Sequence, residues 1–114
     1  MNPGVAAESL ALDPSWVCTI DDVPLGEGRA VTVDGRRIAV FNTPTGWFAL
    51  DAACPHRGGP LADGLVADRC VTCPLHERRF DLQTGAALSG GDHAASHRIV
   101  VRGEDVLVEL TPGT

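Results

Sequence analysis

Short runs rich in apolar residues alternate with clusters of turn-forming residues along most of this chain. The apolar runs predict β-strands at residues 16–20, 29–33, 36–41, 47–51, 97–102 and 106–110. Apolar residues do not recur at helical spacing in any segment. The pattern therefore predicts an all-β fold, an antiparallel β-sandwich or small barrel.

The turns between these runs are specified by their residue types. Asp34-Gly35 is a two-residue hairpin sequence, because both positions of such a turn need positive φ. Residues 42–46 and 103–105 predict further turns. The segment from about residue 53 to 81 interrupts the strand pattern, with turns expected at Asp63-Gly64 and Asp68. We expect this segment to be an insertion that carries a site.

The length of 114 residues predicts one domain, which we place at residues 15–112. Residues 1–14 contain Glu8 and Asp13, no arginine and no clear apolar run, so they predict a flexible N-terminal tail rather than a secretory signal. No window approaches the ~18 apolar residues of a membrane span. We expect a cytoplasmic protein, whose four cysteines are ligands or thiols rather than disulfide partners.

The chain is acidic, with a formal net charge of −6 and a pI near 5.0. Nucleic-acid binding needs a basic face, so this charge argues against a nucleic-acid partner and against an anionic membrane surface. The core of so small a domain is modest, and a bound metal group would help to stabilise it.

Two Cys/His pairs stand out inside the expected insertion. The stretch CPHRGGPL contains Cys54 and His56, and CPLH contains Cys73 and His76. A proline follows each cysteine and stiffens the loop, because it fixes φ and removes one N–H. Two thiols and two imidazoles on two loops make a four-ligand set.

Three chemistries could use these residues. Zinc accepts two Cys and two His, although its usual local pairs share one ligand type. A [2Fe–2S] cluster with Cys₂ on one iron and His₂ on the other suits mixed pairs, since each loop then gives one ligand to each iron. Cys70-Val71-Thr72-Cys73 is formally a C-x-x-C thiol redox motif, but it lacks the βαβ context of that motif.

CPHRGGPL followed by CPLH resembles the two cluster-binding boxes of Rieske [2Fe–2S] proteins in ligand type, order, spacing and flanking prolines. The resemblance covers most of the chain and implies a β scaffold with a cluster-binding insertion. It also implies that Cys54 and Cys73 bind one iron of the cluster, and His56 and His76 the other.

The surroundings of the motif bear on the type of Rieske protein. Respiratory-complex members carry an extra cysteine in each loop, but here Leu75 and the neighbourhood of Gly59 occupy those places. Arg78 and Phe80 replace the serine and tyrosine whose hydroxyls raise the potential. The resemblance therefore excludes quinol oxidation and implies a potential near the low end of roughly −150 to +300 mV.

Two other groups within the family fit the chain. Its whole length is similar to the small subunit of assimilatory NAD(P)H nitrite reductase, which we favour here. That likeness implies an electron carrier for a large subunit with flavin and siroheme, which reduces nitrite to ammonia, and no turnover by this chain alone. The alternative is a free ferredoxin that serves an aromatic-ring dioxygenase. A zinc-stabilised or cluster-free binding module is an alternative of another class.

Some residues in the second loop depart from the family motif, and several residues outside the motif also have expected roles. Glu77 and Arg78 follow His76 where the family often has other residues, so the second loop is expected to turn differently. The arginines near the ligands form either a positive patch or a solvated face: Arg57, Arg69, Arg78 and Arg79. We expect Cys18 and Cys70 to be small buried residues, His93 and His97 to be solvated, and Trp16, Trp47 and Phe48 to lie in the core.

Overall fold

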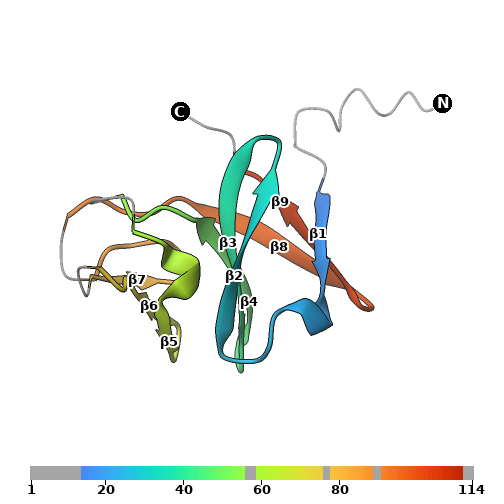
Figure 1. The fold of residues 1–114 in the computed structure, drawn as a ribbon, viewed down its shortest axis with the longest axis horizontal. Coiled ribbons are helices and arrows are strands. Elements are labelled where there is room, and N and C mark those ends of the chain that lie inside the picture. Colours follow the sequence, from blue (N-terminus) through green and yellow to red (C-terminus); the bar gives the residue numbers. More distant parts are fainter. Residues whose placement is uncertain (1–13, 56–58, 76–77, 89–90, 112–114) are drawn as a thin grey trace.

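A computed structural model describes residues 14–55, 59–75, 78–88 and 91–111. These residues form nine strands and two short 3-10 helices, in the order β1 (Ser15–Thr19), η1 (Ile20–Asp22), β2 (Glu27–Val33), β3 (Arg36–Thr43), β4 (Gly46–Asp51), η2 (Leu61–Asp63), β5 (Leu65–Ala67), β6 (Cys70–Thr72), β7 (Arg79–Asp81), β8 (Ser96–Arg102) and β9 (Asp105–Glu109). Figure 1 shows the arrangement. The flexible tail expected at residues 1–14 lies outside the described residues, apart from Pro14.

Six strands form one antiparallel sheet in the order β1-β9-β8-β4-β3-β2. Its edge strands, β1 and β2, contact each other, so the sheet curls into a nearly closed barrel (Figure 1). Within it, Asp34 (φ 50°) and Gly35 (φ 80°) both adopt positive φ in the turn between β2 and β3. The predictions of an all-β fold and of this hairpin are confirmed.

The insertion carries a second sheet that the strand pattern did not predict. Strands β5, β6 and β7 pair antiparallel in that order and form a lobe beside the barrel (Figure 1). Each has only three residues, which is too short for an alternating pattern to be visible in the sequence. Asp68, in the turn between β5 and β6, has φ 55°, as the expected turn requires.

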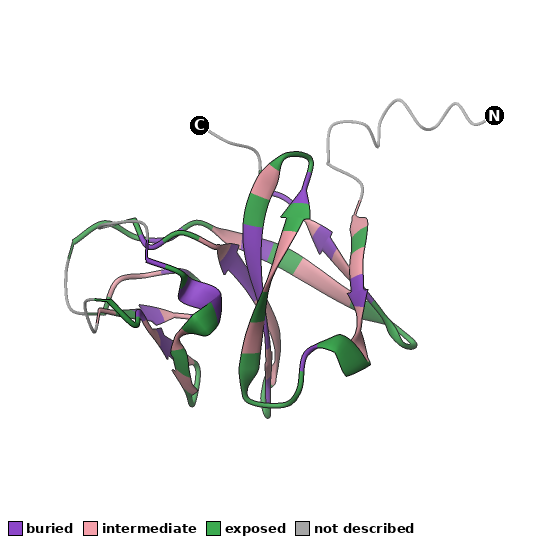
Figure 2. Cartoon of the chain, viewed as in Figure 1, coloured by how far each residue is buried: buried purple, intermediate pink, exposed green. Residues whose placement is uncertain are grey.

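Strand β3 joins two hydrophobic clusters and is buried on both faces (Figure 2). Ile38 and Val40 point into the barrel, where they pack with residues of β9. Ala39 and Phe41 point the other way, into a cluster that includes buried residues of the lobe. The lobe is therefore held to the barrel by a continuous core, and the site that it carries stands on a rigid base.

The prediction that Trp16, Trp47 and Phe48 lie in the core needs correction at Trp16. Trp16 is 57% exposed, and its indole N–H donates to Asp105 Oδ1 at 3.0 Å, so its placement in the core was wrong. The pairing of β1 with β9 shifts register between Trp16 and Cys18, and such a bulge changes which side chains face inward. Trp47 and Phe48 are half-buried and pack against the two clusters.

No helix in the described part of the chain is long and apolar enough to cross a membrane.

Candidate metal centre

The first Cys/His loop leaves the barrel directly after β4. Cys54 is 1% exposed, and its backbone N–H donates to the carbonyl of Gly59 at 2.8 Å. A β-bridge between Ala53 and Pro60 closes the loop at its base. The loop therefore begins and ends at fixed points on either side of the residues expected to contain a ligand.

The second loop connects β6 to β7 and is closed in the same way. Cys73 is fully buried, and its N–H donates to the carbonyl of Arg78 at 2.7 Å. In each loop the cysteine bonds to the carbonyl five residues later, from 54 to 59 and from 73 to 78. The two loops are thus built alike, although their Cys/His spacings differ by one residue.

The two loops face each other at Gly59 and Cys73. A Cβ added to Gly59 would lie 2.6 Å from Cys73 Sγ and 3.3 Å from Cγ and Cδ1 of Leu75. Leu75 is 60% exposed and lies over Gly59 at the surface. A glycine is needed at this position, because any larger residue would displace the thiol of the opposite loop.

The two thiols fit an iron–sulfur cluster. Cys54 and Cys73 are free and belong to one buried cluster of side chains. Thiolates are the ligands that hold such clusters, and burial shields them from solvent. His56 and His76 lie outside the described residues, and among the residues described no group of three or more His, Cys, Asp or Glu is placed to hold a metal ion.

Arg78 and Phe80 occupy the positions around the second loop where a serine and a tyrosine were expected in high-potential members. Phe80 is fully buried and has no hydroxyl to donate to a cluster. Arg78 is half-buried, and its side chain lies beside Gly91, where an added Cβ would be 3.0 Å from Nη1. Arg69 and Arg79 are exposed, whereas Arg57 and Glu77 lie outside the described residues, so the positive patch stays a prediction.

All four cysteines of the chain are free thiols, as expected. Cys18 is buried as predicted, and burial, reinforced by the nearby carboxylate of Asp22, raises its pKa above the ordinary value of 9.0, while Arg29 acts in the opposite direction. Cys70 is only half-buried and sits on strand β6. The C-x-x-C motif therefore begins on a strand rather than before a helix, which argues against a thioredoxin-like site.

His97 is not solvated, and that prediction was wrong. Its side chain is fully buried, and its two ring nitrogens bond to Asp51 and Thr111. The backbone N–H of Thr111 donates to Nδ1 at 3.0 Å, so Nδ1 carries the lone pair and Nε2–H donates to Asp51 Oδ1 at 2.8 Å. Arg36 Nη2 also donates to this carboxylate oxygen, at 3.3 Å.

This network connects Asp51, at the end of β4, to His97 on β8 and to Thr111 in the C-terminal segment. Asp51 lies three residues before Cys54, so the network fixes the base of the first loop. No local sequence pattern could have revealed it, because its members are far apart along the chain. His93, in contrast, is exposed as expected, although its Nδ1 accepts the N–H of Ala87 at 2.9 Å.

Comparison with known proteins gives one family. The Rieske [2Fe-2S] domain family matches residues 13–102. The ferredoxin subunit of the 3-phenylpropionate/cinnamic acid dioxygenase of Shigella boydii is 34% identical over 99 residues, which cover 83% of this chain and 92% of that protein.

Two solved structures extend the likeness to the fold. The ferredoxin of carbazole 1,9a-dioxygenase from Nocardioides aromaticivorans superimposes with a TM-score of 0.79 at 30% identity, covering 86% of this chain and 98% of that one. The nitrite reductase [NAD(P)H] small subunit from Erwinia carotovora gives a TM-score of 0.73 at 26% identity, covering 89% and 84%.

Proposed function

This chain belongs to the Rieske [2Fe-2S] family, and we propose that it is a ferredoxin that delivers single electrons to an aromatic-ring-hydroxylating dioxygenase. Electron transfer through a Rieske-type [2Fe–2S] cluster is the common activity of the proteins that it resembles. The observation that carries the finer proposal is that curated relatives sharing 30% to 37% identity are ferredoxin components of dioxygenase systems.

We propose Cys54, His56, Cys73 and His76 as the cluster ligands, with the two cysteines on one iron and the two histidines on the other. The two buried thiols, the matched closure of both loops and the contact at Gly59 support this assignment. When bound, the cluster accepts and releases one electron at a time. The protein's part is to hold the ligands rigidly and to exclude water from the sulfur atoms.

Exposed apolar residues beside the ligands support an electron-transfer contact at this end of the molecule. Pro55, Pro74 and Leu75 are all exposed and border the two cysteines in sequence. Small apolar surfaces of this kind suit brief encounters between redox proteins. We propose that the oxygenase docks here and that the chain has no turnover without such a partner.

We propose residues 15–112 as the Rieske domain, with residues 53–81 as its cluster-binding segment, and a cytoplasmic location. The strand that begins the barrel starts at Ser15, which supports the first limit. The free state of all four thiols is compatible with a reducing compartment.

The second candidate is the small subunit of an NAD(P)H nitrite reductase, which the sequence features favoured. Its support is the structural likeness to the small subunit from Erwinia carotovora. In this role the chain would remain bound to a large flavin and siroheme subunit. The two candidates differ in the lifetime of the complex, because a shuttle must dissociate from its partner after each electron.

Electron delivery to defined acceptors tests the proposal. The dithionite-reduced chain is mixed in a stopped-flow instrument with the terminal oxygenase of a dioxygenase system, or with the large subunit of an NAD(P)H nitrite reductase. We expect rapid reoxidation by the oxygenase without a complex that survives gel filtration. Reoxidation only by the nitrite reductase subunit, in a complex that co-elutes, would replace the first candidate with the second.

A further inference from the structure

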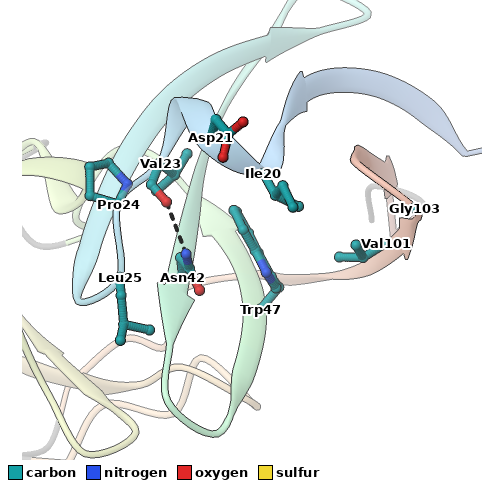
Figure 3. Close-up of a pocket in the computed structure, with 9 residues that line it drawn as sticks. All are labelled: Ile20, Asp21, Val23, Pro24, Leu25, Asn42, Trp47, Val101 and Gly103. Atoms are coloured by element: carbon teal, nitrogen blue, oxygen red, sulfur yellow. Dashed lines mark hydrogen bonds between the residues drawn. The ribbon is translucent and has the colours of Figure 1, made fainter.

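A preformed groove lies at the end of the barrel that Figure 1 places away from the β5–β7 lobe. Its volume is about 540 Å³, and its walls come from η1, the segment before β2, the β3–β4 hairpin and the β8–β9 turn. Figure 3 shows Ile20, Trp47 and Val101 converging on one side, with Leu25 on another wall. None of these residues takes part in the proposed cluster site.

Apolar side chains make up about half of the lining of the groove, and some of them are open to solvent. Leu25 is 64% exposed and Val101 is 40% exposed. Scattered single apolar residues on a surface are ordinary, but here they line one concavity. Burial of such side chains by a partner would release water from an apolar surface, which favours binding.

Hydrogen bonds hold the walls in place. The N–H of Ile20 donates to the carbonyl of Glu104 at 2.9 Å, which ties η1 to the β8–β9 turn. The side-chain amide of Asn42 donates to the carbonyl of Val23 at 2.9 Å, which fixes the opposite wall (Figure 3). A ligand would therefore meet a groove that needs little ordering on binding.

The rim of the groove is acidic. Asp21 lines it, and Glu104 follows Gly103, which also lines it. Neither carboxylate takes part in a hydrogen bond or ion pair within the described part of the chain. The carboxylate of Asp22, in contrast, accepts hydrogen bonds from the N–H and the hydroxyl of Thr19. Arg102, although close in sequence, forms no ion pair with either of them among the described residues. Asp21 in the lining and Glu104 next to it in sequence are thus two carboxylates that form no ion pair among the described residues.

We propose that this groove is a second docking surface, which takes a segment of a partner protein that presents one leucine-like side chain flanked by arginine or lysine. The apolar walls would receive the leucine, and Asp21 and Glu104 would pair with the basic residues. Because the groove and the lobe lie on different sides of the barrel, both surfaces can be occupied together (Figure 1). The inference goes beyond electron transfer and does not depend on which enzyme receives the electron.

The test uses the full chain with its cluster, labelled for nuclear magnetic resonance. The probe is the peptide Ac-Gly-Arg-Leu-Arg-Gly-NH₂, and the matched control is Ac-Gly-Glu-Leu-Glu-Gly-NH₂, each titrated into the millimolar range. We expect saturable shifts of the Trp47 indole N–H and of the Leu25 and Val101 methyls with the basic peptide alone. The double variant Asp21→Asn, Glu104→Gln should weaken binding by roughly two- to tenfold, since each exposed ion pair contributes little.

Val101→Asn serves as a second variant, because it replaces an apolar side chain of the wall with a neutral polar one and leaves Asp21 and Glu104 unchanged. We expect it to abolish the shifts while the chain keeps its fold. Equal shifts with both peptides, shifts confined to residues of the lobe, or no shifts at the highest concentration would each overturn the proposal. Electron delivery to an oxygenase is measured separately, so its failure cannot be confused with any of these results.

Discussion

Gly59 and Cys73 stand so close that the structure leaves no room for a side chain between them: a Cβ on Gly59 would lie 2.6 Å from Cys73 Sγ. Two loops from different parts of the chain, one after β4 and one after β6, meet at this point. The contact brings together the two halves of the proposed ligand set. It also explains why a glycine stands at this place in the first loop.

Gly59→Ala tests this contact. The added methyl group would push Cys73 away from its position, so we expect much lower iron content per chain and weaker visible absorbance after expression. Gly103→Asn is the control, since nothing lies within 4 Å of a Cβ there and asparagine tolerates its φ of 62°. Full iron content with an unchanged spectrum in Gly59→Ala would show that the loops meet differently.

Arg78→Glu tests the electrostatic role of the second loop. Reduction adds one negative charge to the cluster, so a positive neighbour favours the reduced form and a negative one opposes it. We expect the midpoint potential to fall by on the order of tens of millivolts, measured by protein-film voltammetry. Arg98→Glu on β8, whose side chain is 75% exposed beside Glu109, should change the potential far less. An unchanged or higher potential in Arg78→Glu contradicts the prediction.

The six barrel strands could be predicted because their signals are local. The turn at Asp34-Gly35 requires residues that tolerate positive φ, and the apolar run of β3 matches a strand buried on both faces. Strands β5 to β7 have three residues each, and their pairing depends on contacts with the rest of the lobe. Their sequence alone carries no comparable pattern.

The motif predicted the cysteines of the candidate site correctly, but the sequence did not predict the residues that surround the site as well. Cys54 and Cys73 are buried, free and on facing loops, as a ligand role requires, whereas the histidine positions stay predictions. The burial of His97 could not be foreseen, because its partner Asp51 lies 46 residues away in sequence. The exposure of Trp16 follows from a register shift in the pairing of β1 with β9, which no residue type in the sequence predicts.

His97→Ala tests the network at the base of the first loop. It leaves a cavity and removes the buried ring to which Asp51 and the Thr111 N–H are hydrogen-bonded, so we expect a loss of about 2 kcal/mol in the free energy of unfolding, measured by chemical denaturation. His97→Gln, which can still donate and accept, should lose less. The neighbouring Arg98→Ala, at an exposed position, should stay within about 0.5 kcal/mol of the parent chain. Equal stability of His97→Ala and the parent chain would contradict a structural role for the network.

Cys18 should make stability depend on pH at the alkaline end. Burial and Asp22 raise the pKa of its thiol above 9.0, so near and above that pH the unfolded chain loses a proton that the folded chain keeps. The contribution is complete below about pH 9 and declines as the pH rises. Unfolding free energies measured from about pH 7 to about pH 10 should therefore fall less steeply for Cys18→Ala than for the parent chain or for Cys70→Ala. Parallel curves for all three would refute this.

The most direct test of the central claim, that Cys54, His56, Cys73 and His76 hold one [2Fe–2S] cluster, is electron paramagnetic resonance on the anaerobically purified, dithionite-reduced full chain, with iron and zinc analysis. The account predicts a rhombic signal with the low average g value of mixed Cys/His ligation and about two iron atoms per chain. A silent spectrum without iron after reconstitution, or colourless protein with stoichiometric zinc, would contradict it and assign these loops to a zinc-stabilised or cluster-free binding module.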